Sequence, residues 1–124
     1  MHYSEWLGRL YILEQYLGEC IAPVCKEYHL NSTEMTILLF LHNNPSKDTA
    51  KDIIAYSRLA KANVSKAVEH LMRRDLLERV RDVQDRRVAH LCLTETAERM
   101  MPDLHAAAEH YLQGLFADFS PEEM

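Results

Sequence analysis

The sequence predicts a mainly α-helical protein of the α+β kind, a winged helix-turn-helix flanked by long N- and C-terminal helices. Three observations support this fold class. Apolar residues recur at three- and four-residue steps through most of the chain, which is typical of amphipathic helices. Two short helical patterns follow one another near its middle. Immediately after the second, the period changes to alternation around a polar turn, which indicates a β-hairpin.

The first predicted helix covers residues 4–28, where leucines and other apolar residues form a stripe along one side. A second helix is expected after Asn31, because Asn31 can cap its N-terminus while Glu34 bonds back to the cap. This helix is apolar almost all round as far as Leu41, so we expect it in the core. The polar run 43–46, which contains a proline, then predicts a turn.

Two short helices with a tight connection follow. Thr49 is expected to cap the first, which runs to about Tyr56, and the second covers residues 61–74. One face of the second helix is apolar, formed by Val64, Ala67, Val68 and Leu71. The opposite face carries small, polar and basic residues towards the N-terminus. Such a pair is typical of a helix-turn-helix, in which the second helix contacts DNA.

Alternating residues predict two strands, 77–82 and 88–93, joined by a polar turn. This hairpin directly follows the helix-turn-helix, which is the position of the wing in a winged helix. Thr94 is expected to cap a final helix over residues 95–118. The helix-turn-helix and wing would then form a lobe over residues 32–93, within a single domain of 124 residues.

The two long helices, residues 4–28 and 95–118, carry more apolar surface than a small three-helix core needs. Pairing them across a two-fold axis would bury that surface, so both are predicted to be dimerisation helices of a homodimer. In such a dimer the two DNA-contacting helices would lie about one turn of DNA apart, ~34 Å.

The charge of the chain is unevenly distributed. The formal net charge of −5 by itself disfavours a nucleic-acid partner. Residues 58–87, however, hold nine basic and five acidic residues, a local net charge of +4 that leaves −9 for the rest. A basic segment in an acidic protein is either a contact surface for phosphates or a solvated helix face, and charge alone does not separate these alternatives.

Composition and motifs disfavour several classes of protein. The longest clean apolar run, residues 37–41, is too short for a bilayer, which needs ~20 apolar residues, and the N-terminus lacks a secretory signal pattern. Three cysteines without a CxxC pair indicate a reducing compartment, so a cytoplasmic location is expected. Because the sequence has no glycine-rich phosphate loop, GxSxG or HExxH pattern, we expect neither an enzyme nor a bound cofactor.

From Thr49 to Thr94 the sequence resembles the MarR family of transcription regulators. The likeness is carried by the segments Asp52-Ile53-Ile54, Asn63-Val64-Ser65-Lys66-Ala67-Val68, Leu76-Leu77-Glu78-Arg79, Asp82-Val83-Gln84-Asp85-Arg86-Arg87 and Leu93-Thr94-Glu95. An Asp-Arg-Arg wing between an Asn-Val-Ser-Lys helix and Leu-Thr-Glu is a specific combination. The flanking helices match in length and placement, so the likeness covers nearly the whole chain.

The resemblance implies a homodimer that binds pseudo-palindromic double-stranded DNA operators, commonly as a repressor released by a small-molecule effector, an oxidant or a metal. Three positions depart from the family pattern. Ala60 stands where a small polar or acidic residue usually caps the recognition helix, and Asp75 stands where glycine is common. The family's final dimerisation helix would begin at Ser120, so its absence here predicts a weaker or differently built dimer.

The predicted DNA-binding residues lie on the second short helix and on the hairpin: Lys61, Asn63, Ser65, Lys66, Arg73, Arg79, Asp85, Arg86 and Arg87. Asn63, Ser65 and Lys66 are expected at or near base edges in the major groove, because asparagine can pair with adenine and lysine can reach guanine. Arg73 and Arg79 are expected to contact phosphates or to form surface ion pairs. The alternative for Lys61, Asn63, Ser65 and Lys66 is that they are merely exposed helix positions.

On the wing, Arg86 is expected at the tip, where the negative potential of the minor groove attracts it. Asp85 is expected to orient an arginine by a charge-assisted hydrogen bond. Arg87 is expected either to contact a phosphate or to form a structural salt bridge to the body of the protein. A winged helix that binds protein instead of DNA is the alternative function, although such a module needs no arginine at the wing tip.

Four aromatic residues are candidates for an effector cleft between the dimerisation helices and the DNA-binding lobe: Trp6, Tyr11, Tyr16 and Tyr111. Core and dimer packing explain the same residues without a ligand. Cys20 and Cys25 are candidates for oxidant sensing, as well as for simple apolar packing. His105 and Glu109 lie four apart on a helix face, but a metal site needs three or four converging ligands, so no metal ligand is assigned.

Overall fold

The computed structural model describes residues 19–118, with side chains described as far as residue 114. These residues form two compact units. One is Leu30–Pro102, and the other combines residues 19–29 with residues 103–118. The first part of the predicted helix 4–28 and the position of Ser120 lie outside the described residues.

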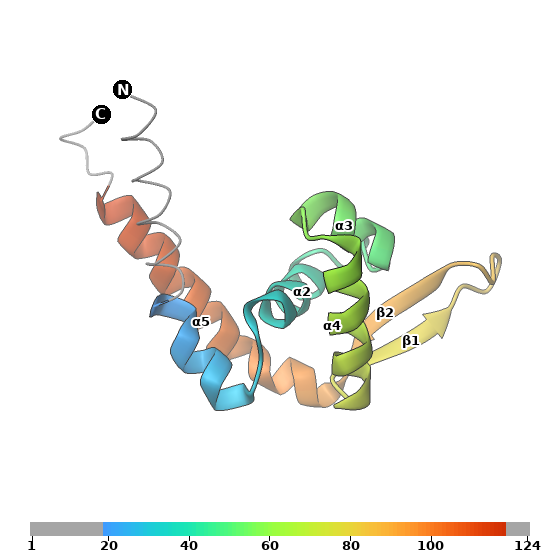
Figure 1. Ribbon diagram of the computed structural model, residues 1–124, viewed down its shortest axis with the longest axis horizontal. Coiled ribbons are helices and arrows are strands. Elements are labelled where there is room, and N and C mark those ends of the chain that lie inside the picture. Colours follow the sequence, from blue (N-terminus) through green and yellow to red (C-terminus); the bar gives the residue numbers. More distant parts are fainter. Residues whose placement is uncertain (1–18, 119–124) are drawn as a thin grey trace, which may run out of the picture. The chain divides into compact units, whose positions relative to one another are not determined.

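The Leu30–Pro102 unit contains three helices and a two-stranded wing (Figure 1). Its helices are α2 (Ser32–Asn43), α3 (Ala50–Ser57) and α4 (Lys61–Arg73), and its strands are β1 (Leu77–Arg81) and β2 (Ala89–Leu93). The long helix α5 (Glu95–Asp118) begins in this unit. Because α2 contacts α3, α4 and β2, it joins the helix-turn-helix to the wing. The predicted fold class, a mainly helical winged helix-turn-helix, is confirmed.

Side chains just before each helix fix where it starts. Asn31 and Glu34 form a capping box at α2, with Asn31 Oδ1 accepting the Glu34 N–H at 2.8 Å and Glu34 Oε1 accepting the Asn31 N–H at 2.9 Å. Thr49 and Asp52 form the same box at α3. The Thr94 hydroxyl accepts a backbone N–H of α5 at 3.2 Å. The three caps expected from the sequence are therefore present.

The core of this unit is built from every one of its helices. Its largest fully buried side chains include Ile37 and Leu38 of α2, Ile53 of α3, and Val64 and Leu71 of α4. Burial of one such side chain stabilises the fold by about 1.5–3 kcal/mol. The central place of α2 agrees with a helix that is apolar almost all round.

Helix α4 starts without a side-chain cap and is followed, two residues after its end, by a left-handed residue. Ala60, at the N-cap position, has no side chain that can accept a hydrogen bond. At the other end the Leu76 N–H donates to the Leu71 carbonyl and the Asp75 N–H to the Met72 carbonyl, both at 3.0 Å. This is a Schellman motif, which needs a left-handed residue after the helix. Asp75 accordingly has φ 59°, a region that favours glycine.

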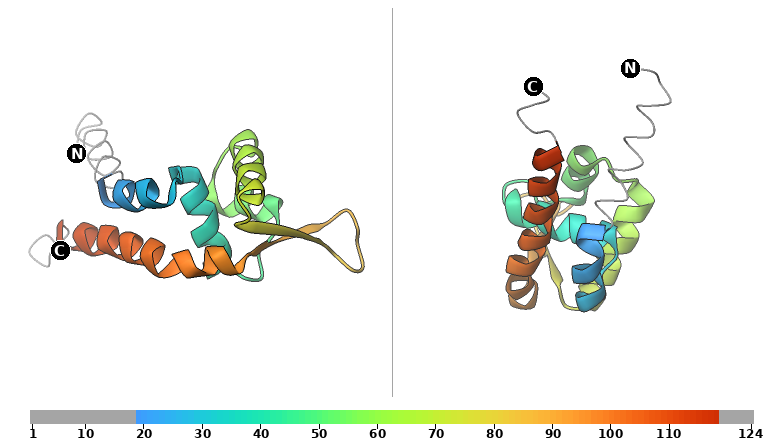
Figure 2. Two further views of the ribbon diagram at one scale, coloured as in Figure 1. Left: turned by 90° about the horizontal axis from the view of Figure 1, so that it is seen from below. Right: turned by 90° about the vertical axis from the view of Figure 1, so that its left-hand side faces the viewer.

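The wing is an antiparallel hairpin that projects beyond the helices (Figure 2). Arg79 pairs with Leu91, and Arg81 with Ala89. Leu77 at the start of β1 and Leu91 in β2 are buried, whereas the rest of β1 is exposed. The hairpin is therefore attached to the core near its base and leaves its turn in solvent. Both strands agree with the predicted ranges to within a residue.

In the other unit, residues 19–28 are helical and the helix continues through Pro23. Val24 and Cys25 are buried. The Tyr28 hydroxyl donates a hydrogen bond to the carboxylate of Asp103, and this bond raises the pKa of Tyr28 to about 12. Between residues 19 and 118, no helix combines the length and the apolar character that crossing a membrane requires. The dimerisation role of the long helices stays a prediction.

Candidate DNA-binding surface

The exposed side of α4 carries the residues that the sequence assigned to DNA contacts. All five of them are exposed: Lys61, Asn63, Ser65, Lys66 and Arg73. The helical period explains this, because the residues between them, Val64, Ala67, Val68 and Leu71, turn into the core. The surface of α4 therefore offers lysine cations and an amide that can both donate and accept hydrogen bonds. Contact of these residues with DNA stays a prediction.

A buried carboxylate fixes α4 against the start of α2. Glu34 is 2% exposed, and its carboxylate pairs with the Nδ1 atom of His70 in α4. The pair lines a cavity of about 210 Å³, to which Asn63 and Lys66 also contribute. Sequence reasoning gave Glu34 its capping role but missed this second contact. The contact places the N-terminus of α2 next to the two residues expected to read bases.

In the wing turn, Asp85 holds Arg87. Arg87 donates from Nε to Asp85 Oδ1 at 3.1 Å, from Nη2 to Oδ2 at 3.2 Å, and from its backbone N–H to Oδ1 at 3.0 Å. These hydrogen bonds lower the pKa of Asp85. An arginine oriented by Asp85 was expected, and the structure shows that it is Arg87. Arg86 is exposed next to it, and its carbonyl accepts from Arg81 Nη1 at 3.4 Å.

The base of the wing turn is organised by Asp82. Its Oδ2 atom accepts the backbone N–H groups of Gln84 at 2.9 Å and Asp85 at 2.8 Å. Its Oδ1 atom bonds to the Nε2 atom of His90 at 2.9 Å. The other ring nitrogen of His90 bonds to Asp48 at 2.7 Å. Sequence reasoning treated His90 only as a strand residue, because Asp48 is 42 residues away and the contact with Asp82, 8 residues away, depends on the register of the hairpin.

Further along the wing, Arg79 in β1 lies 3.5 Å from Glu69 of α4, measured from Nη2 to Oε1. Both side chains are largely exposed, so this pair adds little to stability. Of the two roles expected for Arg79, the surface ion pair is present in the structure. The phosphate contact of Arg79 stays a prediction.

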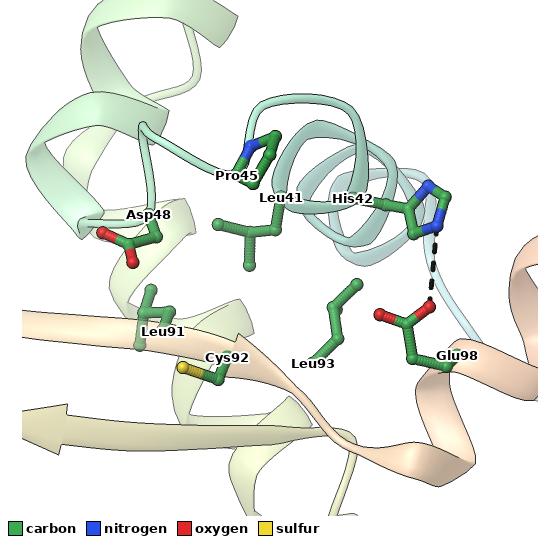
Figure 3. A pocket seen from close by; sticks show the side chains of 8 residues that line it. All are labelled: Leu41, His42, Pro45, Asp48, Leu91, Cys92, Leu93 and Glu98. Carbon is green, nitrogen blue, oxygen red and sulfur yellow. Dashed lines mark ion pairs between the residues drawn. The ribbon is translucent and has the colours of Figure 1, made fainter.

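A second cavity, about 220 Å³, lies between α2, β2 and the start of α5 (Figure 3). Leucines of α2 and β2 form its apolar wall. His42 and Glu98 form an ion pair on one side of it, 3.5 Å from Nε2 to Oε2, and Asp48 lies on the other side (Figure 3). Cys92 also lines it. This cavity differs from the aromatic cleft that the sequence suggested.

The candidate sensing residues are only partly within the described residues. Trp6, Tyr11 and Tyr16 lie outside them, and Tyr111 of α5 is half-buried. Cys25 is buried and Cys20 is half-buried. Among the described residues, no three histidine, cysteine or acidic side chains converge in a way that could hold a metal ion. The aromatic effector site and the oxidant-sensing cysteines stay predictions.

A helix-turn-helix with exposed lysines on α4 and a wing with exposed arginines together form a winged helix. Comparison with known proteins shows which family this sequence resembles. The sequence profile of the MarR family matches residues 29–88. The uncharacterised HTH-type transcriptional regulator YsmB of Bacillus subtilis (strain 168) is 30% identical over 66 residues. Over residues 29–88 the chain matches the MarR family of transcription regulators.

Solved structures of two DNA-binding proteins share the fold. A DNA complex of MepR from Staphylococcus aureus has a TM-score of 0.82 at 21% identity, covering 99% of this chain and 88% of that one. BpsR of Bordetella bronchiseptica has a TM-score of 0.79 at 23% identity, with the same coverage. The match to YsmB covers 53% of this chain and 45% of YsmB, so less than half of that curated relative is matched.

Proposed function

We propose that the chain is a ligand-responsive repressor that binds a pseudo-palindromic DNA operator as a homodimer. In this proposal α4 enters the major groove, where Asn63 and Lys66 contact base edges. The wing follows the DNA backbone into the minor groove with Arg86 and Arg87. Each operator half-site would bind one protomer, and the protein would act in the cytoplasm.

The observation that carries the proposal is the exposure of cationic and amide side chains on both DNA-facing elements of one compact unit. Lys61, Asn63 and Lys66 are exposed on α4, and Arg86 and Arg87 are exposed on the wing. α4 contacts β1, so both elements are held in the same unit. A winged helix that binds protein has no need for this set of cations.

The relatives support the finer parts of the proposal. MepR of Staphylococcus aureus has been solved bound to DNA. DNA binding by BpsR of Bordetella bronchiseptica is regulated by 6-hydroxynicotinic acid, which makes a small organic acid or heteroaromatic compound a reasonable first class of effector to test. A cyclic two-fold dimer is the assembly that a pseudo-palindromic operator requires.

Selection of DNA fragments from a random pool by the purified protein tests the proposal. We expect an inverted repeat to emerge, and its affinity to fall steeply with salt because each neutralised phosphate releases counterion. Asn63→Ala should relax base preference at one position of each half-site, whereas Arg86→Ala should weaken binding to all sequences. Enrichment of no sequence, together with salt-independent retention, would contradict DNA binding; sedimentation as a monomer at micromolar concentration would contradict the dimer.

A further inference from the structure

His90 joins the wing to the body of the helix-turn-helix through two carboxylates. Its Nδ1 atom lies 2.7 Å from Oδ1 of Asp48, in the loop before α3, and its Nε2 atom lies 2.9 Å from Oδ1 of Asp82, where β1 ends. The three side chains are about one-third exposed, with relative exposures of 32%, 28% and 33%. The contact therefore links two parts of the chain that are far apart in sequence.

The chemistry of this bridge fixes the charge of the ring. A carboxylate can only accept hydrogen bonds, and a neutral imidazole has one donor and one acceptor nitrogen. Two carboxylate partners are satisfied together only when both ring nitrogens donate, which is the imidazolium form. The two aspartates raise the pKa of His90, and the bonds from His90 and two backbone N–H groups lower the pKa of Asp82.

The bridge acts on the part of the wing that carries the arginines. Asp82 also organises the turn, since its Oδ2 atom accepts the Gln84 and Asp85 N–H groups. Asp85 in turn holds Arg87. On the other side, the Asp48 carbonyl accepts the Leu91 N–H at 2.7 Å, so the aspartate is fixed by its own backbone. A continuous chain of hydrogen bonds thus runs from Asp48, in the loop before α3, to Arg87 in the wing turn.

We propose that His90 is a positioning residue for DNA binding, whose imidazolium holds the wing on the helix-turn-helix and thereby places Arg86 and Arg87 against the DNA. This inference rests on the proposed function, because it names the device that prepares the wing for DNA. It also makes the placement of the wing dependent on pH.

The other charged and titratable groups around the bridge have separate partners or positions. Lys47, beside Asp48, lies over the Tyr56 ring with its Nζ 4.5 Å from the ring centroid. Arg81, beside Asp82, donates to the Arg86 carbonyl. Glu78 and Cys92, which pair with each other, share the face of the hairpin that His90 occupies. The pKa of His90 is raised by its two aspartate partners, so titration of His90 breaks the bridge as pH rises through that raised pKa.

The pKa shifts of His90 and Asp82 determine how the attachment of the wing depends on pH. His90 has a pKa raised above its ordinary 6.5, so the attachment is complete below pH 6.5 and is lost as pH rises through the raised pKa. Asp82 has a pKa lowered below its ordinary 3.8. Its contribution to the attachment of the wing is therefore fully present above pH 3.8 and is lost only as pH falls through the lowered pKa. The wing is thus held best in mildly acidic solution.

The first test uses the protein without DNA. Nitrogen-15 NMR of the histidine rings should show both His90 nitrogens protonated at pH 6. Hydrogen exchange of the turn amides 83–88 should accelerate as pH rises from 6 to 9, after correction for the intrinsic pH dependence, and should be fast at both pH values in His90→Gln. A neutral ring at pH 6, or exchange that is identical in the two proteins, would overturn the inference.

The second test measures binding of a 30-base-pair duplex of mixed sequence by fluorescence anisotropy at low salt. At pH 6, His90→Gln should bind roughly three- to tenfold more weakly than the unmodified protein, the net scale of one ordinary hydrogen bond. At pH 9 the two affinities should converge. Asp48→Ala, which keeps the backbone bond to Leu91 but has no side-chain acceptor, should behave like His90→Gln, while His110→Gln, an exposed histidine of α5, should keep the pH profile of the unmodified protein.

The two tests separate the inference from the proposed function. If the unmodified protein and the variants at His90 and Asp48 all bind the duplex with the same pH profile, the inference is wrong and DNA binding stands. If the duplex is not bound at all, the proposed function is wrong, and with it the role of His90 in DNA binding. Hydrogen exchange then decides whether His90 holds the wing.

Discussion

The guanidinium of Arg87 is held by two hydrogen bonds to the carboxylate of Asp85 while 91% of the arginine side chain stays exposed. An exposed arginine normally samples many rotamers and loses that freedom when it binds. Here a neighbouring carboxylate has already restricted the side chain. Because the pKa of Asp85 is lowered, its ion pair with Arg87 is fully formed above pH 3.8. It is lost only as pH falls through the lowered pKa.

This relationship gives a prediction that simple charge counting would reverse. Asp85→Asn removes a negative charge from the wing, and repulsion of phosphates alone would make DNA binding tighter. We expect binding weaker by roughly three- to tenfold, because Arg87 loses a charge-assisted, two-point partner. Fluorescence anisotropy with an operator fragment measures the change.

Glu78→Gln is the matched control, since it removes the same charge from an exposed position of β1. It should leave the affinity unchanged or raise it slightly. If Asp85→Asn strengthened binding as much as Glu78→Gln does, Asp85 would have no orienting role.

The sequence alone predicted the local parts of this structure well. Asn31, Thr49 and Thr94 were expected as caps and act as caps, because a capping interaction spans only three residues. The buried side of α4 followed from its 3.6-residue period. Asp75 stands where the family commonly has glycine. Its positive φ explains why glycine is favoured at this position.

The contacts that sequence reasoning missed join distant positions. Glu34 and His70 are 36 residues apart, and Asp48 and His90 are 42 residues apart. No periodicity or spacing brings such residues together, because their approach depends on how α2, α4 and the hairpin pack. Which arginine Asp85 orients was left open for a different reason, since the conformation of a tight turn decides which of two adjacent arginines folds back.

The missing cap at Ala60 predicts a simple stabilising substitution. Ala60 has φ −67° and ψ 140°, an extended conformation that suits an N-cap serine. Ala60→Ser should raise the free energy of unfolding by about 1 kcal/mol, because its hydroxyl can accept a free N–H of the first turn of α4. Urea denaturation followed by circular dichroism measures this change.

Ala62→Ser provides the control for Ala60→Ser, because it places the same side chain within the first turn of the helix. Serine has a lower helix propensity than alanine, so this variant should be slightly destabilised. Equal effects from the two variants would mean that the hydroxyl at position 60 does not cap α4.

Asp75 predicts a second stabilising change, at the other end of α4. The left-handed conformation at φ 59° costs an L-residue about 1 kcal/mol, and glycine removes most of that cost. Asp75→Gly should therefore raise the free energy of unfolding by somewhat under about 1 kcal/mol, despite the greater flexibility of glycine in the unfolded chain. Arg73→Gly, two residues earlier inside the helix, should lower it by about 1 kcal/mol. Destabilisation by both glycines would show that the Schellman geometry does not determine stability here.

The Tyr28–Asp103 hydrogen bond predicts a distinct behaviour in alkaline solution. The pKa of Tyr28 is raised from 10.0 to about 12, so its stabilising contribution is complete below pH 10 and is lost as pH rises through about 12. Titration of tyrosinate absorbance at 295 nm should show a component near pH 12 that disappears in Tyr28→Phe and shifts to lower pH in Asp103→Asn. Tyr56→Phe, which alters an exposed tyrosine of α3, should leave that component in place. A titration curve that Tyr28→Phe changes no more than Tyr56→Phe would mean that Tyr28 and Asp103 are not hydrogen-bonded in solution.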